Sequence, residues 1–299
     1  MKYGYIGLGN LGGHLAYNLV KAGLPMVVTD LNHDNAERHL AAGAKWAATP
    51  QALASEVDCV ITCLPSPKVS RFVLDQILPV MKPGTTWIEM STLGRADICA
   101  LAEHAAHHGI KTLACPVTGG VHLAAQGKIT VLVGGDQELF EKHQAALEVM
   151  GDRIFHLGKI GSEAVVKVIT NMLAFIHLLS CGEALMLAKR GGVDLAQAYH
   201  AIAASSGTSF VHETEGQLIL NGSYDIAFTM DLALKDLGFA MDYGREFGVP
   251  LNLAALTQQT FITGAATYGR DAQSTQIVKL LEDALGTDLR APGFPARLE

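Results

Sequence analysis

A glycine-rich turn near the N-terminus constrains the fold of this chain more than any other feature. The segment YIGLGNLGGHL contains the pattern G-x-G-x-x-G at Gly7, Gly9 and Gly12. A strand-like run, KYGYI, precedes the turn, and a helical pattern, GHLAYNLVKAG, follows it. The glycine pattern alone is weakly specific, but between a strand and a helix it predicts the first unit of a dinucleotide-binding fold. There the first glycine permits a tight turn, the second lets backbone approach a pyrophosphate, and the third packs helix against strand.

An acidic residue follows the next strand-like run. The segment MVVTD ends at Asp30, eighteen residues beyond Gly12. A carboxylate at this place can accept hydrogen bonds from ribose hydroxyls and would repel a 2′-phosphate. The first arginine after it is Arg38, well separated along the chain. The sequence therefore predicts NAD as the cofactor in preference to NADP, and a glycine turn without a ligand is the alternative.

Strand-like and helical runs alternate in the first half of the chain and then stop doing so. The strand-like runs include PMVVTD, DCVITCLP, TTWIEMS, KTLACPV, ITVLVGG and RIFHLG. Helical patterns of about ten to fifteen residues between strands imply βαβ units and a parallel sheet covered on both faces. From Glu163 onward the apolar spacing is helical. We predict an α/β domain with a doubly wound sheet at residues 1–161, followed by an all-α domain at residues 162–299.

Composition narrows the class of protein. Of the 299 residues 49% are hydrophobic and 17% charged, which is typical of an ordered globular protein. The formal net charge is −7 and no basic run is present, so we expect no nucleic-acid partner. The five cysteines include no CxxC pair, and the segment HAAHHG has no neighbouring acidic or cysteine ligands. We therefore expect free thiols and no metal site.

The N-terminus and the longest apolar tract bear on location. The segment MKYGYIGLG is too short and too rich in glycine for the apolar part of a signal peptide. The tract from Val165 to Ala188 is long enough to cross a bilayer, but it carries Lys167 and Glu183 among other polar residues. We expect a buried helix, no membrane partner and a cytoplasmic protein.

Two further motifs offer groups for small-molecule chemistry. In CPVTGG the hydroxyl of Thr118 is followed by Gly119 and Gly120, whose exposed N–H groups can hold a carboxylate without a cation. An ordinary Gly-Gly turn is the alternative. In VVKVITN, Lys167 and Asn171 are four residues apart and share one helix face. A lysine in so apolar a tract is rare unless it is paired, reaches solvent, or has a function.

A fourth motif, LALKDLGFAMD, carries Lys235 and Asp236, which alone would suggest a surface charge pair. In this order the four motifs resemble the β-hydroxyacid dehydrogenase family, which includes 3-hydroxyisobutyrate dehydrogenase and tartronate semialdehyde reductase, over nearly the whole chain. The resemblance implies a Rossmann-type N-terminal domain, a helical C-terminal domain joined by a long helix, and a cleft between them. It also implies a homodimer or homotetramer.

The resemblance further implies the reaction and the site. Hydride would pass between NAD(H) and a small carboxylate substrate, a β-hydroxy acid or semialdehyde, with Lys167 as the catalytic acid or base. The implied substrate-binding residues are Thr118, Gly119, Gly120 and Asn171. The implied cofactor-binding residues are Gly7, Gly9, Asn10, Leu11, Gly12, Asp30, Leu64, Pro65, Thr92 and Lys235.

The chain departs from the family pattern before the carboxylate turn. Relatives usually have an aspartate and an alanine where this chain has Ala114 and Cys115, and a serine where it has Thr118. The missing carboxylate leaves the substrate open. Relatives that recognise sulfonates carry an arginine beside this turn, so Gly119 argues against a sulfonate.

Three other functions are compatible with parts of the pattern. Decarboxylating 6-phosphogluconate dehydrogenase shares the opening motifs but has a larger helical domain. An NADP-dependent short-chain aldehyde or imine reductase, or a non-catalytic NAD-binding regulatory module, could use the same scaffold. Because proteins of these last kinds often lack the lysine, the presence of Lys167 together with Asn171, Thr118 and Lys235 favours the dehydrogenase.

Overall fold

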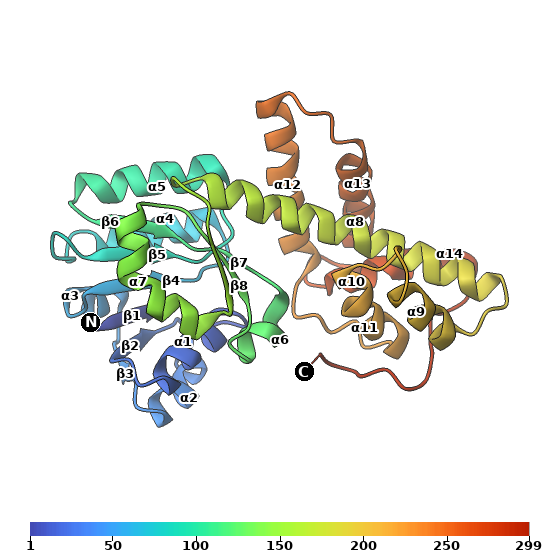
Figure 1. The fold of residues 1–299 in the computed structure, drawn as a ribbon, viewed down its shortest axis with the longest axis horizontal. Helices are drawn as coiled ribbons and strands as arrows, with labels where there is room; N and C mark the ends of the chain where they lie inside the picture. The colour runs from blue at the N-terminus through green and yellow to red at the C-terminus, as the bar shows by residue number, and fades with distance from the viewer. Residues whose placement is uncertain (299) are drawn as a thin grey trace. The chain divides into compact units, whose positions relative to one another are not determined.

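The computed structural model describes residues 1–298. They form two compact units, residues 1–167 and residues 168–298, and Figure 1 labels most of their elements. The division falls inside one long helix, α8, which begins at Ser162 and ends at Arg190. The predicted domain boundary between residues 161 and 162 is the place where this helix begins, and the compact units divide a little more than one turn later.

The first unit contains a six-stranded parallel sheet in the order β3-β2-β1-β4-β5-β6. Its strands are β1 (Tyr3–Ile6), β2 (Met26–Thr29), β3 (Lys45–Trp46), β4 (Cys59–Thr62), β5 (Thr86–Glu89) and β6 (Lys111–Ala114). The four central strands are buried along their whole length, which explains why they read as continuous apolar runs rather than alternating ones. The two-residue edge strand β3 was not anticipated, because it is too short to leave a pattern.

A second, three-stranded sheet follows in the order β7-β8-β9. It comprises β7 (Val117–Thr118), β8 (Thr130–Val133) and β9 (Arg153–His156). The expectation that these runs continue the parallel sheet is wrong for β7, which pairs antiparallel with β8. The chain between them folds back through one short helix, whereas a parallel pair needs a longer crossover. An isolated bridge between Ala114 and Gly134 joins the two sheets.

Helices cover both faces of the six-stranded sheet, as predicted. They are α1 (Gly12–Lys21), α2 (Glu37–Ala41), α3 (Pro50–Ser55), α4 (Pro67–Ile77), α5 (Arg95–His107), α6 (Gly120–Ala125) and α7 (Gln137–Met150), with a 3-10 helix at His33–Ala36. One core cluster contains Leu15 of α1 and Leu147 of α7. The other contains Leu53 of α3, Leu74 of α4 and Leu101 of α5. The predicted Rossmann-type α/β fold followed by a helical region is confirmed.

Helix α8 is long and apolar enough to cross a membrane by length and composition, a test that core helices of soluble proteins also pass. It bears two buried ionisable side chains, Glu163 and Lys167, in its first turns. Charged groups of this kind are costly in lipid. The tract therefore has the character of a helix that packs within the protein and carries buried polar groups.

The regular elements among the described residues of the second unit are helices, and one isolated bridge joins Thr229 and Gln273. After α8 it contains α9 (Leu195–Ala203), α10 (Phe210–Glu213), α11 (Glu215–Asn221), α12 (Met230–Phe247), α13 (Asn252–Tyr268) and α14 (Lys279–Leu285), with a 3-10 helix at Ser274–Val278. Its core includes Phe175 of α8, Leu237 of α12 and Phe261 of α13. Figure 1 shows α12 and α13 as a neighbouring pair.

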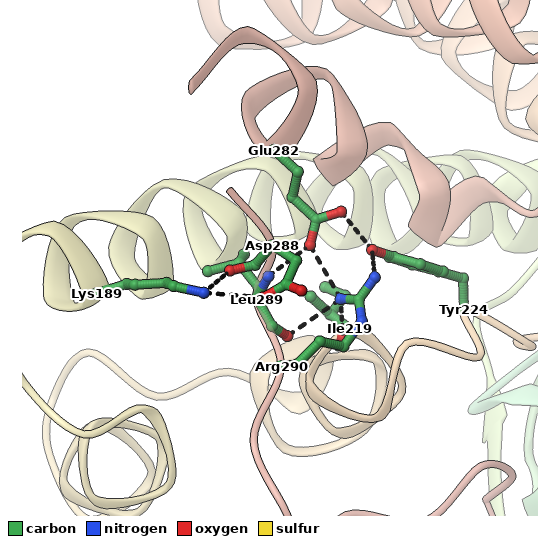
Figure 2. Close-up of polar contacts among 7 residues, drawn as sticks. All are labelled: Lys189, Ile219, Tyr224, Glu282, Asp288, Leu289 and Arg290. Carbon is green, nitrogen blue, oxygen red and sulfur yellow. Dashed lines mark hydrogen bonds and ion pairs between the residues drawn. The ribbon is translucent and has the colours of Figure 1, made fainter. Parts of the chain in front are cut away.

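A buried polar network fastens the segment after α14 to this unit (Figure 2). The Glu282 carboxylate, 4% exposed, accepts hydrogen bonds from Tyr224 Oη at 2.5 Å, Leu289 N–H at 2.8 Å and Arg290 Nη1 at 3.0 Å. Lys189 of α8 pairs with Asp288 at 2.9 Å. Because a buried charge is tolerated only when it is paired and hydrogen-bonded, the network fixes the course of the C-terminal segment.

Candidate functional site

The three glycines of the N-terminal turn have three different surroundings. Gly7 has φ +99°, and a Cβ there would lie 2.3 Å from the Cys63 carbonyl oxygen. A Cβ on Gly12 would lie 2.2 Å from the Gly7 carbonyl oxygen. A Cβ on Gly9 would meet nothing within 4 Å. The first and third glycines are thus required by the fold itself, whereas Gly9 leaves open space at the start of α1, where a pyrophosphate can approach backbone N–H groups.

Asp30 lies directly after β2, beside this turn. Its carboxylate accepts hydrogen bonds from Leu8 N–H at 2.6 Å, Asn32 N–H at 2.9 Å and Asn35 Nδ2 at 3.0 Å. The Arg38 guanidinium lies over the ring of Tyr17, 5.2 Å from its centroid, and its Nη2 is 2.9 Å from the position of a Cβ on Gly13. An acidic group, held by backbone, therefore occupies the position where the ribose of a dinucleotide would be bound, and the residues present fit such a cofactor.

The ends of β4 and β5 are tied together beside the turn. Leu64 N–H donates to Ser91 Oγ at 2.7 Å, and Ser91 N–H donates to Glu89 Oε1 at 2.7 Å. Glu89 is 1% exposed, and burial raises the pKa of its carboxyl. The predicted residues Leu64, Pro65 and Thr92 thus follow strands whose carboxyl ends meet at the edge of the sheet that bears Gly7. Ser91 and Glu89 were missed in the sequence, where nothing marks them.

The TGG turn has a backbone that only glycine adopts without strain. Gly119 has φ +125° and Gly120 has φ +87°. Thr118 is held by pairing with Thr130 across β7 and β8. The ring of His122 lies 3.1 Å from the position of a Cβ on Gly120, and burial lowers the pKa of this histidine. Successive backbone N–H groups in a turn can form an anion-binding concavity.

Lys167 and Asn171 occupy successive turns of α8. Lys167 is only 7% exposed. Asn171 Nδ2 donates to Asp236 Oδ2 at 2.6 Å, and Lys235 Nζ donates to Asp236 Oδ1 at 2.7 Å. The alternative of a surface charge pair at 235–236 does not hold for Asp236, which is 1% exposed. The contacts of Asp236 were not anticipated, although its apolar helical frame was a signal of burial.

The structure therefore gathers the predicted residues into two groups. Gly7–Gly12, Asp30, Leu64 and Thr92 lie at the carboxyl ends of the parallel strands in the first unit. Asn171 and Lys235 meet through Asp236 in the second unit. Lys167 is the last residue of the first unit and precedes Asn171 by one helical turn.

Comparison with known proteins agrees with this arrangement. Residues 2–158 match the NAD-binding domain of 6-phosphogluconate dehydrogenase, and residues 161–281 match the NAD-binding family of NADP-dependent 3-hydroxyisobutyrate dehydrogenase. The chain is 34% identical to 2-(hydroxymethyl)glutarate dehydrogenase of Eubacterium barkeri, with 97% of each chain covered. It is 32% identical to L-threonate dehydrogenase of Cupriavidus necator, covering 92% of this chain and 94% of the relative.

A solved structure shows the same fold. The 3-hydroxyisobutyrate dehydrogenase of Salmonella typhimurium is 28% identical, with a TM-score of 0.87 over 94% of this chain and 99% of the other. The matched relatives span the dinucleotide-binding half and the helical half alike. The chain is an NAD(P)-dependent oxidoreductase acting on the CH–OH group of β-hydroxy acids, and it belongs to the β-hydroxyacid dehydrogenase family.

Proposed function

We propose that the protein interconverts a small β-hydroxy acid and its carbonyl product, with NAD(H) as the redox partner and Lys167 as general acid and base. The observation that carries this proposal is the burial of Lys167 one helical turn before Asn171. Burial disfavours an ammonium ion, so it moves a lysine toward the pH range in which it can exchange protons. The bound dinucleotide supplies the hydride acceptor in oxidation and the hydride donor in reduction.

The proton is exchanged with Lys167, separately from the hydride. In oxidation the neutral Lys167 amine takes the hydroxyl proton of the substrate as the C–H bond is cleaved and the carbonyl forms. In reduction its ammonium returns a proton to the developing alkoxide. General acid–base catalysis of this kind contributes roughly 10²–10⁴-fold to the rate.

In this proposal the groups of the TGG turn that contact the substrate are polar but uncharged. Thr118 and the backbone N–H groups of Gly119 and Gly120 bind the substrate carboxylate, supported by the positive φ of both glycines. Asn171 orients the substrate, and its amide is itself held by the buried Asp236. Lys235, which is paired with the Asp236 carboxylate, contacts the cofactor near its nicotinamide.

Asp30 supports NAD over NADP. Its carboxylate would face the adenosine ribose, and a 2′-phosphate there would meet a negative charge. Arg38, the first arginine after Asp30, lies over Tyr17 and beside Gly13, so the proposed preference rests on the charge of Asp30. Asn10, Leu11, Leu64, Pro65 and Thr92 complete the proposed cofactor contacts.

The relatives suggest where to search for the substrate. Their names specify 2-(hydroxymethyl)glutarate, L-threonate and 3-hydroxyisobutyrate, all small hydroxy acids. We further propose a cytoplasmic homodimer or homotetramer. Support for assembly comes from exposed apolar side chains on the helices of the second unit, such as Leu187, Leu253 and Leu256.

The direct test is an NADH-absorbance assay over small hydroxy acids and semialdehydes, run in parallel with NAD and NADP. We expect turnover of at least one β-hydroxy acid and a higher kcat/KM with NAD. A blank panel from protein that binds NADH tightly would contradict the proposal and favour a binding module. Sedimentation of the same preparation tests the oligomer.

A further inference from the structure

A buried carboxyl group lies one helical turn before Lys167. Glu163 is fully buried in the first turn of α8. Its Oε2 accepts a hydrogen bond from Gly161 N–H at 2.8 Å. Its Oε1 is buried as well and has no hydrogen-bond partner among the described residues. Buried polar atoms are nearly always hydrogen-bonded, so an unpaired carboxyl oxygen calls for a specific partner.

A small cavity adjoins this carboxyl inside the first unit. Its volume is about 10 Å³, and its wall includes Glu163, Glu89, Ser91, Ala114 and Pro116. This is close to the space that one water molecule needs. Two carboxyl groups therefore face one water-sized space.

Glu163 lies against the backbone pair that joins the two sheets. Ala114 and Gly134 exchange both backbone hydrogen bonds, at 2.9 and 2.8 Å. A Cβ on Gly134 would lie 1.7 Å from Glu163 Oε2, so the carboxyl rests directly on this pair. Helix α8 thus brings a carboxyl to a cavity wall that Ala114 also lines.

We propose that Glu163 and Glu89 form a buried site that holds one water molecule and one shared proton. The Glu163 O–H donates to the water, and the water donates to Glu89. No covalent bond to carbon changes. The proton site is independent of the proposed reaction.

The two carboxyl groups differ in their hydrogen bonds. Glu89 accepts from the Ser91 N–H, the Ser91 hydroxyl and the Thr62 hydroxyl, which favour its charged form. Glu163 accepts backbone hydrogen bonds, among them that of the Gly161 N–H, and burial raises its pKa to about 7. Ser91 Oγ also accepts from Leu64 N–H, so the proton site is connected to the edge of the sheet that binds the dinucleotide.

Several titratable groups surround Glu163. Glu89 lies across the cavity, the Cys115 thiol lies on the strand end, and Lys167 lies one turn along α8. Arg95 and Cys99 of α5 lie against Gly161, the hydrogen-bond donor to Glu163. When Glu163 ionises, its negative charge raises the pKa of the buried Cys115 thiol.

Infrared difference spectroscopy of the ligand-free protein tests the proton site without any substrate. We expect a carbonyl band of a buried protonated carboxyl that disappears with a midpoint near pH 7. The band should be absent in Glu163→Gln and unchanged in Glu183→Gln, which alters an exposed glutamate of the same helix. A band that persists in Glu163→Gln, or no band in the wild type, would overturn the site.

Discussion

The two units of the molecule provide candidate site groups in different ways. In the first unit the groups are backbone atoms, glycines and one carboxylate at the ends of parallel strands, as at Gly9 and Asp30. In the second unit they are long side chains on helices, Asn171 and Lys235, held by the buried Asp236. A backbone-made site tolerates few substitutions but needs little support. A side-chain site depends on the partners that fix each rotamer.

The largest expected effect comes from a substitution in the glycine turn of the first unit. Gly12→Val should abolish NADH binding and unfold the first unit, because its Cβ would lie 2.2 Å from the Gly7 carbonyl oxygen. Gly9→Ala should fold normally, since nothing lies within 4 Å of its Cβ, yet weaken NADH binding by about tenfold or more. Gly238→Ala, also in open space but on α12, is the control. Circular dichroism and NADH fluorescence check all three, and normal binding by Gly9→Ala would contradict the assignment.

A second prediction concerns the loss of stability of the first unit at low pH. His143 is fully buried between Tyr3 Oη and Thr86 Oγ1, and burial lowers its pKa to about 4. The unfolded chain binds the proton first, so stability falls as pH drops from about 6.5 to 4, by about 3 kcal/mol. Denaturant unfolding at several pH values should show the first unit losing this stability and His143→Gln lacking that loss. The pKa of Glu163 is raised, so its contribution to stability increases as pH falls, opposite to that of His143. The effect of His143 is therefore the difference in unfolding free energy between wild type and His143→Gln. If the unfolding free energy of both proteins changed equally with pH, the prediction would be refuted.

A third prediction tests the dependence of the helical half on Asp236. Asp236→Ala leaves the Asn171 amide and the Lys235 ammonium without their buried acceptor, and should destabilise the second unit by about 1.5–3 kcal/mol. Asp231→Ala, on the same helix, removes an exposed pair with Arg270 and should cost about 0–1 kcal/mol. Urea unfolding compares them. Equal costs would mean that the buried carboxylate does not organise this half.

The smallest expected effect concerns cofactor choice. Asp30→Asn removes the negative charge while keeping an oxygen that can accept the Leu8 N–H bond. We expect the preference for NAD over NADP to fall by about tenfold, equivalent to about 1.4 kcal/mol. The ratio of the two kcat/KM values measures it. A ratio that does not move would show that Asp30 serves the loop and not the choice of cofactor.

The same contrast explains what sequence could and could not predict. The glycine turn, Asp30 and the TGG turn were readable because a backbone conformation requires particular residues at fixed spacing. Asp236 meets Asn171 from 65 residues away, and Glu163 meets Gly134 across two elements, so no local pattern marks either contact. The antiparallel β7 and the two-residue β3 were missed for the related reason that tertiary pairing, not periodicity, creates them.

The most direct test of the central claim is the activity of Lys167→Ala on whichever β-hydroxy acid the wild type oxidises. We expect kcat/KM to fall by at least about 100-fold while NADH binding stays near the wild-type value, because the lysine moves a proton and does not hold the dinucleotide. Lys189→Ala, on the same helix and paired with Asp288, should keep its activity. Substantial turnover by Lys167→Ala would contradict the account.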